Sequence, residues 1–272
     1  MQDKTTTYHP KNRNPAPIKY MAVGAHHDDV EIMATDGILK GQTDNGSFCA
    51  VIATDGRGSA RSGTYADYSD ERMAQTRTEE QKAVAELGRY HSVIFLNHTS
   101  ASVKTDPAED VVASLVDVFR TTRPEVLYTH NPFDKHTTHV QLLKRVVEAL
   151  RRLPSEHRPK LYGVEVWRDL DWLVDADKTV FDVTAGRDLT KAQLARFDSQ
   201  VAGGKRYDLA TEGRRLAHAT YFESHDVDAA TQLVFAIDMS ALMEDDALSL
   251  ETFAKHLIDR FKDDVLERIR SG

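Results

Sequence analysis

The sequence predicts an α/β fold: a three-layer sandwich whose mostly parallel sheet carries helices on both faces. Short apolar runs alternate with longer segments of helical spacing from the N-terminal part onward, and such alternation implies right-handed βαβ crossovers. The first apolar run, residues 18–25, is followed at once by four polar residues, which is typical of a buried strand with a polar tip. No repeat or break in composition divides the chain.

The first half of the chain supplies four strands and four helices in this prediction. The strands are expected at residues 18–25, 47–53, 91–97 and 125–129, and the helices at 29–40, 69–87, from 106 onward and from about 136 onward. Gly88 follows the second helix, where a C-terminal cap favours glycine. Asp106-Pro107 is a typical N-cap and first helical residue. The Gly-, Ser- and Arg-rich segment 57–68 is expected to be an exposed loop.

Beyond Pro154 the order of elements changes. We expect strands at 160–166, 179–183 and 234–238, a helix at 189–200 and a closing amphipathic helix at 250–269. The polar, proline-bearing segment 1–17 is expected to be a flexible arm. The single domain then spans residues 18–272.

The composition excludes several classes of protein. The chain has 272 residues, of which 40% are hydrophobic and 29% charged, so it can bury one large core and is not disordered. Its 35 Lys+Arg against 43 Asp+Glu give a net charge of −8, which argues against nucleic-acid binding. No apolar run approaches the ~20 residues that cross a bilayer, and neither a signal peptide nor a disulfide partner for Cys49 is apparent. We expect a cytoplasmic protein without nucleic-acid or membrane partners.

Ionisable side chains gather at three of the expected strand ends. They lie at residues 26–29 after the first strand, 54–56 after the second and 130–139 after the fourth, and five of the twelve histidines belong to the first and third groups. In open parallel sheets, ligands bind outside the carboxyl ends of the strands. The sequence therefore predicts a site at this edge.

Two imidazoles and a carboxylate with open coordination positions make a catalytic site for a divalent metal, and imidazole suits Zn²⁺ and Fe²⁺. His26 and Asp29 can come from one turn, and the third ligand is either His136 or His139, which lie on the first turn of one helix. Asp28 is a candidate to take a proton from metal-bound water. Capping of the following helix by Asp29 is the alternative explanation of the first group.

At these residues the sequence resembles the PIG-L/LmbE-like N-acetylglucosaminyl deacetylase family. AHHDDVE, TDGRG and DKHTTH stand, in order, where that family has its Ala-His-Pro-Asp-Asp-Glu motif, its Thr-Asn/Asp-Gly turn and its His-Pro-Asp-His stretch. Weaker similarity at 77–88 and 191–200 extends the resemblance to about residues 18–200.

The resemblance implies a Rossmann-like fold. It also implies a zinc-dependent hydrolase that removes the acetyl group from an N-acetylated amino sugar or related glycoconjugate. It implies His26, Asp29 and His139 as metal ligands, with another divalent ion such as Fe²⁺ compatible with them. Asp28 would be the general base, and His136 the imidazole that assists the tetrahedral intermediate or the leaving amine. A homo-oligomer is a further expectation from the family.

The sequence departs from the family's pattern at three positions. His27 and Val30 replace a Pro and a Glu at positions that are not ligands. Thr138 replaces an Asp that orients the neighbouring imidazole, and Asp134 is a candidate to substitute for that carboxylate.

Six residues near the expected site are candidates to bind substrate: His27, Asp55, Arg57, Arg77, His130 and Asp134. Arg57, with Arg61, lies in the glycine-rich loop and is a candidate to meet an anionic part of the substrate, although loop arginines are more often solvated. Asp55 more often orders its own turn. Arg77 is spaced for an intrahelical pair with Glu80. Trp167 and Trp172 are expected in the core.

Two other classes of function fit part of the pattern. A non-haem Fe(II) oxygenase also uses two histidines and a carboxylate, but such triads commonly lie on antiparallel barrels. A non-catalytic ligand-binding protein on the same scaffold would not need Asp28. No G-x-G-x-x-G follows the first strand, which argues against dinucleotide binding.

Overall fold

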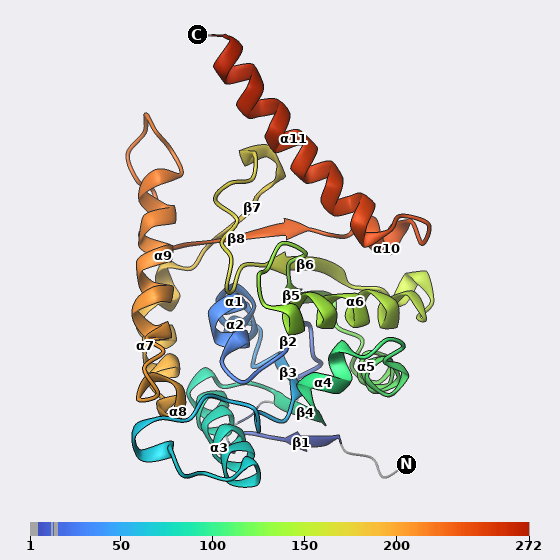
Figure 1. The fold of residues 1–272 in the computed structure, drawn as a ribbon, viewed down its shortest axis with the longest axis vertical. Coiled ribbons are helices and arrows are strands. Elements are labelled where there is room, and N and C mark those ends of the chain that lie inside the picture. The colour runs from blue at the N-terminus through green and yellow to red at the C-terminus, as the bar shows by residue number, and fades with distance from the viewer. Residues whose placement is uncertain (1–4, 12, 14–15, 272) are drawn as a thin grey trace.

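The computed structural model describes residues 5–11, 13 and 16–271. In this part of the chain an eight-stranded sheet has the strand order β1-β4-β3-β2-β5-β6-β8-β7 (Figure 1). The strands are β1 (Thr6–Tyr8), β2 (Tyr20–Gly24), β3 (Phe48–Thr54), β4 (Ser92–His98), β5 (Val126–His130), β6 (Lys160–Val164), β7 (Thr179–Asp182) and β8 (Leu233–Asp238). Strands β4, β3, β2, β5 and β6 are parallel, and β1, β8 and β7 pair antiparallel with their neighbours. The predicted fold class is confirmed.

The helices of the described chain cover both faces of this sheet. They are α1 (Asp29–Met33), α2 (Thr35–Thr43), α3 (Asp70–Gly88), α4 (Ser100–Lys104), α5 (Glu109–Thr122), α6 (Thr137–Arg151), α7 (Arg187–Leu194), α8 (Asp198–Val201), α9 (Tyr207–Tyr221), α10 (Ala241–Glu244) and α11 (Leu250–Arg270). Met21 and Val23 of β2 belong to the core under α5, α6 and α10, whereas Ala22 belongs to the core under α1, α2 and α3. This alternation is the two-residue period of a strand that is buried on both faces.

The helix expected at 29–40 is two helices that meet at Ala34. The Ala34 N–H still donates to Val30 O at 2.8 Å, but its ψ of 26° ends α1. The buried Arg215 of α9 donates to Ile32 O at 3.0 Å and to Thr35 Oγ1 at 2.9 Å. A side chain far along the sequence thus donates a hydrogen bond to a backbone carbonyl group at the break between the helices. The hydrophobic pattern of residues 29–40 does not reveal this contact.

Two other helix boundaries differ from the prediction. The helix expected from Asp106-Pro107 begins at Glu109, because the Asp106 carboxylate accepts from Arg145 Nη1 at 3.3 Å and Ala108 takes the cap position. The helix expected at 189–200 is divided into α7 and α8, and α9 occupies a segment where none was expected.

Part of the segment expected to be a flexible arm belongs to the sheet. Thr6–Tyr8 pairs antiparallel with β4, and Tyr8 Oη donates to Glu86 Oε1 of α3 at 2.5 Å. Residues 1–4, 12 and 14–15 of this segment lie outside the described residues.

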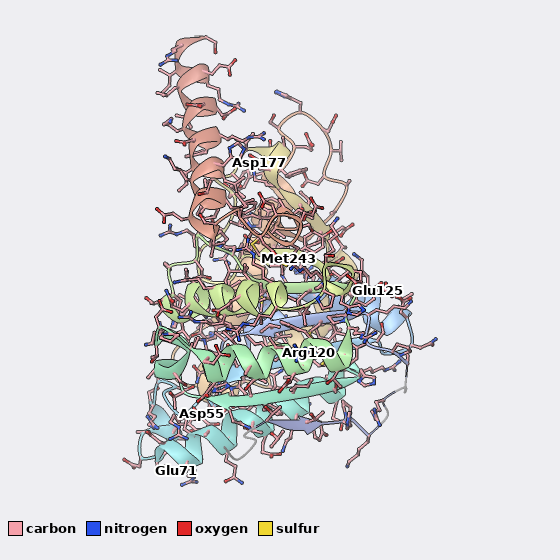
Figure 2. All side chains as sticks on the ribbon, turned by 90° about the vertical axis from the view of Figure 1, so that its right-hand side faces the viewer. Asp55, Glu71, Arg120, Glu125, Asp177 and Met243 are labelled. Carbon is pink, nitrogen blue, oxygen red and sulfur yellow. The ribbon has the colours of Figure 1, made fainter. Side chains whose placement is uncertain are left out.

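The closing helix α11 was expected, and it lies against the body along its first half. Leu257 is buried and Phe253 packs against the core, whereas Ile269 near the end is 72% exposed. Figure 2 shows the second half extending beyond the other elements. Among the described residues, none of the helices is long and apolar enough to span a bilayer.

Candidate metal centre and active site

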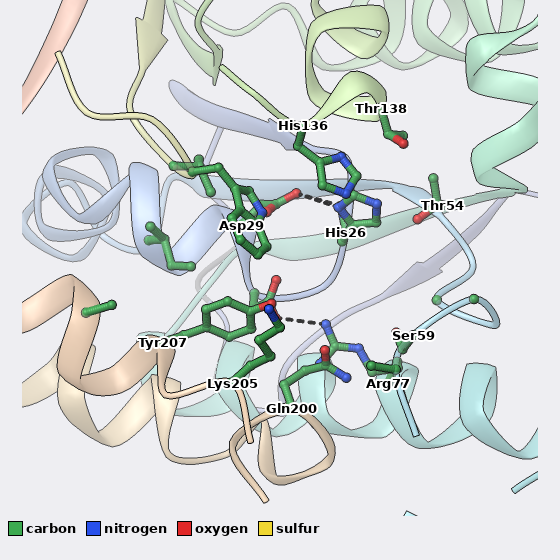
Figure 3. A pocket seen from close by; sticks show the side chains of 18 of the residues that line it. His26, Asp29, Thr54, Ser59, Arg77, His136, Thr138, Gln200, Lys205 and Tyr207 are labelled. Carbon is green, nitrogen blue, oxygen red and sulfur yellow. Dashed lines mark hydrogen bonds and ion pairs between the residues drawn. The ribbon is translucent and has the colours of Figure 1, made fainter. Parts of the chain in front are cut away.

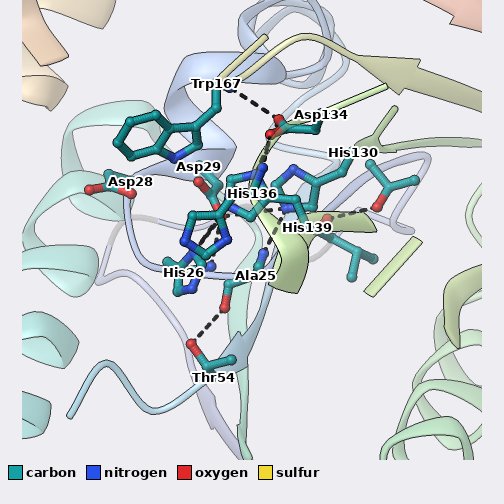
Figure 4. Close-up of polar contacts among 12 residues, drawn as sticks. Ala25, His26, Asp28, Asp29, Thr54, His130, Asp134, His136, His139 and Trp167 are labelled. Atoms are coloured by element: carbon teal, nitrogen blue, oxygen red, sulfur yellow. Dashed lines mark hydrogen bonds and ion pairs between the residues drawn. The ribbon is translucent and has the colours of Figure 1, made fainter. Parts of the chain in front are cut away.

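The carboxyl ends of β2, β3 and β5 meet at one edge of the sheet. The Ala25 N–H, just after β2, donates to His130 Nε2 at the end of β5 over 3.0 Å. Thr54 at the end of β3 donates through Oγ1 to Ala25 O at 2.7 Å. These contacts bring the three expected groups of ionisable residues to one place (Figure 4).

Three atoms that could bind a metal ion form a nearly equilateral triangle at this place. His26 Nδ1 lies 3.1 Å from His139 Nε2, and Asp29 Oδ2 lies 3.3 Å from each of these nitrogens. In tetrahedral zinc sites with bonds of about 2.0–2.1 Å, ligand atoms stand about 3.3 Å apart. The donor set and its spacing therefore fit Zn²⁺.

Hydrogen bonds outside the triangle orient its members. His139 Nδ1 donates to Asp134 Oδ2 at 3.2 Å, which turns Nε2 toward the triangle. Burial lowers the pKa of His139 to about 4, so its imidazole is neutral at pH 7, as a metal ligand must be. Burial opposes the ionisation of Asp29, but the neighbouring histidines hold its pKa well below the ordinary value.

The Asp134 carboxylate is hydrogen-bonded to the ring of His139, the predicted metal ligand, and not to the ring of His136. Its Oδ1 accepts from the His136 backbone N–H at 2.8 Å, and its Oδ2 also accepts from Trp167 N at 3.1 Å. The His136 ring lies beside His26 and His139, with centroids 4.9 and 4.5 Å away, and its Nδ1 has no partner in the described chain. Burial lowers the pKa of His136.

Two other groups bring ligand atoms together within 4.8 Å: His26, His136 and His139, and Asp29, His130 and His139. The group of Asp29, His130 and His139 is a poor metal site, because the Nε2 lone pair of His130 already accepts a hydrogen bond from the Ala25 N–H. The first lacks the carboxylate that holds the backbone of His26 through a 2.7 Å hydrogen bond to Asp29. The ring of His136 thus lies beside the triangle of His26, Asp29 and His139.

Asp28 lies beside the triangle and is paired with Arg77. Arg77 Nη2 donates to Asp28 Oδ2 at 3.0 Å and also to the carbonyl oxygen of His27. Burial raises the pKa of Asp28 to about 6, and Arg77 opposes this rise. Arg77 also contacts Glu80 at 3.4 Å, and Glu80 accepts from Ser199 Oγ at 2.8 Å. The expected intrahelical pair therefore also connects α3 to α8.

A pocket of about 560 Å³ opens over these groups. His26, Asp28, Asp29 and His136 lie in its wall, and the opposite wall comes from the α8–α9 segment, including Gln200, Lys205 and Tyr207 (Figure 3). Gln200 ends the 191–200 stretch that resembles the family, whereas no pattern in the sequence marked Lys205 or Tyr207 as part of a site.

Of the six candidate substrate-binding residues, Arg77 lies in the pocket wall. His27 is buried and stacks on Phe95, with centroids 5.8 Å apart, and burial lowers its pKa. Asp55 and Arg57 form an ion pair at 2.6 Å within their turn and do not line the pocket.

His130 and Asp134 are buried behind the triangle. Contrary to expectation, Trp167 lines the pocket next to His136, with centroids 6.0 Å apart, whereas Trp172 packs on Phe133 in the core.

The fold and the site together define a class: an α/β protein in which histidines and a carboxylate meet at the carboxyl edge of the parallel strands and form a candidate metal centre. Residues 21–150 match the family described as PIG-L, GlcNAc-PI de-N-acetylase. This matched part of the chain carries the whole histidine cluster, and the resemblance found in the sequence is confirmed.

Solved structures share the fold over most of their length. The N,N'-diacetylchitobiose deacetylase from Pyrococcus horikoshii is 15% identical, with a TM-score of 0.66 over 84% of this chain and 86% of that one. GalB, the 4-carboxy-2-hydroxymuconate hydratase from Pseudomonas putida KT2440, is 19% identical, with a TM-score of 0.64 over 81% and 96%. The zinc-inhibited form of teicoplanin deacetylase Orf2 is 12% identical, with a TM-score of 0.57 over 81% and 98%. A comparison with curated proteins finds no match.

Proposed function

We propose that the protein is a zinc-dependent N-deacetylase that hydrolyses the acetamide of an amino sugar or related glycoconjugate. The observation that carries this proposal is the triangle of His26, Asp29 and His139 beside Asp28 in the pocket of a chain that matches the PIG-L family. Deacetylases among the proteins of similar fold support the same reaction class.

The three ligands would hold Zn²⁺, which supplies Lewis acidity for the amide carbonyl and lowers the pKa of a water molecule. Asp28 is mostly ionised at pH 7, because its pKa is about 6, and accepts the proton of the attacking water. Arg77 holds that carboxylate in place. The His136 imidazole would relay the proton that Asp28 has accepted to the leaving nitrogen as the C–N bond breaks. The products are acetate and a free amine.

The test is acetate release from a panel of N-acetylated amino sugars by metal-depleted and zinc-restored protein, under anaerobic conditions. We expect acetate only from the restored protein. Turnover that appears only after iron is supplied and oxygen is admitted would instead support the oxygenase alternative. Specific binding of the sugars without turnover, in the zinc-restored protein, would support a non-catalytic binding protein.

A second candidate reaction is the addition of water to a carbon–carbon double bond. It is favoured by the similarity in fold to a hydratase whose named substrate is a carboxylated muconate. Loss of the ultraviolet absorbance of a conjugated dienoic acid, without acetate release from any sugar, would favour hydration over deacetylation.

A further inference from the structure

The pocket wall has the opposite charge to the molecule as a whole. The chain carries a net charge of −8. Among the described residues that line the pocket, however, the acidic ones are Asp28 and Asp29, and the basic ones are Arg77, Lys104, Lys205, Arg206 and Arg214. A pocket lined by cations attracts and retains an anionic ligand.

Two of these five cations already have carboxylate partners. Arg77 is paired with Asp28 at 3.0 Å. Arg206 makes two hydrogen bonds to Asp208, of 3.0 and 2.7 Å. Neither is therefore free to neutralise a ligand.

The remaining cations have no ion pair within the described chain. Arg214 Nη1 donates to Val166 O at 2.5 Å. Its guanidinium is therefore held by a neutral carbonyl group, which does not balance its positive charge. Lys205 places Nζ 5.2 Å from the centre of the Trp167 ring, which orients the ammonium without neutralising it. Lys104 is exposed on the α4 side of the pocket.

These cations lie within reach of the reacting groups. Trp167, which lies against Lys205, is 6.0 Å from the His136 ring, and the carbonyl that holds Arg214 belongs to the residue before it. One ligand of sugar size can therefore contact both the histidine cluster and the cations in a pocket of about 560 Å³.

We propose that the substrate carries an acidic group, a carboxylate or a phosphate ester, which Lys205 and Arg214 bind while its acetamide lies at His26, Asp29 and His139. The inference rests on the proposed deacetylase function and specifies its substrate class. It assigns anion recognition to α9 and the residues just before it. The loop arginine Arg57, considered from the sequence, is neutralised by Asp55.

The experiment compares three probes that share one acetamide: N-acetylglucosamine, its 6-phosphate, and N-acetylmuramic acid, which carries a carboxylate. Acetate release by the zinc-restored full chain gives kcat and KM, and calorimetric titration gives binding independently of turnover. The variants are Lys205→Gln and Lys205→Glu. The matched control is Lys135→Gln, because Lys135 also lies over the Trp167 ring, at 5.9 Å, but does not line the pocket.

We expect one or both acidic probes to bind at least about tenfold more tightly than the neutral sugar. Lys205→Gln should raise KM for the acidic probe by roughly three- to tenfold, and Lys205→Glu by more, with little change for the neutral sugar. Lys135→Gln should behave as wild type. Comparison of the affinities for the 6-phosphate and for N-acetylmuramic acid shows whether the site prefers a phosphate or a carboxylate.

Equal binding of neutral and acidic probes, or an acidic preference that survives Lys205→Glu, would overturn the inference. Acetate released equally from all three probes would overturn the inference but support the deacetylase function. Preferential binding of acidic probes that is lost in Lys205→Glu, without acetate release from any probe, would support the anion site and count against the deacetylase.

Discussion

Asp28 and Asp29 are neighbours in the chain, yet their carboxylates have different partners. Asp28 Oδ2 faces Arg77, while Asp29 Oδ2 lies within 3.4 Å of nitrogens of His26, His130 and His139. The backbone at Asp28 has a φ of 98°, a conformation that costs about 1–3 kcal/mol for a residue other than glycine. Backbone strain of this kind clusters at functional sites.

Replacing Asp28 by Asn tests its role as the base. Asn tolerates positive φ and fills the same space, but it cannot accept the proton of the attacking water. We expect turnover to fall by about 10²–10⁴-fold while zinc content is unchanged, as measured by acetate release and metal analysis. Asp44→Asn, in the turn before β3 and outside the pocket wall, is the control. Wild-type turnover in Asp28→Asn would exclude Asp28 as the base.

Replacing Asp134 by Asn tests the orientation of the His139 ring. Asn accepts a weaker hydrogen bond than the carboxylate now bonded to His139 Nδ1. We expect zinc affinity to fall by about 10–100-fold, measured by competition with a chromophoric chelator, and Asp28→Asn to keep wild-type affinity. Unchanged affinity in Asp134→Asn would mean that the ring is held by its packing alone.

At the scale of elements, α2 approaches β3 closely at Gly41. A Cβ there would lie 2.5 Å from Phe48 Cβ and 2.9 Å from Phe48 N, so Gly41→Ala forces helix and strand apart. We expect a loss of about 1–3 kcal/mol in the free energy of unfolding, measured with urea. Gly213 of α9 is the control, since a Cβ there meets nothing within 4 Å. Gly213→Ala should gain up to about 1 kcal/mol. Similar effects of both substitutions would contradict this packing.

At the scale of the whole molecule, Glu31 makes folding depend on pH. It is fully buried, accepts from Gln81 Nε2 and Tyr90 Oη at 2.8 Å each, and its Oε2 has no partner in the described chain. Burial raises its pKa from 4.5 to about 8, although both hydrogen bonds oppose the rise. The folded protein therefore keeps a proton that the unfolded chain loses near pH 4.5.

The contribution of protonated Glu31 to the free energy of unfolding is complete below about pH 4.5 and is lost as pH rises through about 8. We expect the free energy of unfolding to fall across this window by up to about 1.4 kcal/mol per pH unit more in wild type than in Glu31→Gln. Urea titrations at several pH values, with a chelator present to remove metal effects, measure the difference. Parallel pH profiles for the two proteins would show that Glu31 is ionised in the folded state.

The sequence by itself determined the order of strands and helices in the first half of the chain, because two- and 3.6-residue periods are local properties. It also determined which strand ends carry His26, Asp29 and His139, since the carboxyl ends of parallel strands share one edge. The choice of His139 over His136 as a ligand came only from the family resemblance, and remains a prediction.

Only the tertiary structure decided which charges are neutralised. Arg77 meets Asp28 across 49 positions, and Arg215 reaches Ile32 across 183. Arg57, a candidate from the sequence, is paired within its own turn, while Lys205 and Arg214, which line the pocket, form no ion pair with any residue that the structure describes. Ion pairs and hydrogen bonds form between groups close in space, and a local pattern does not encode how distant segments pack.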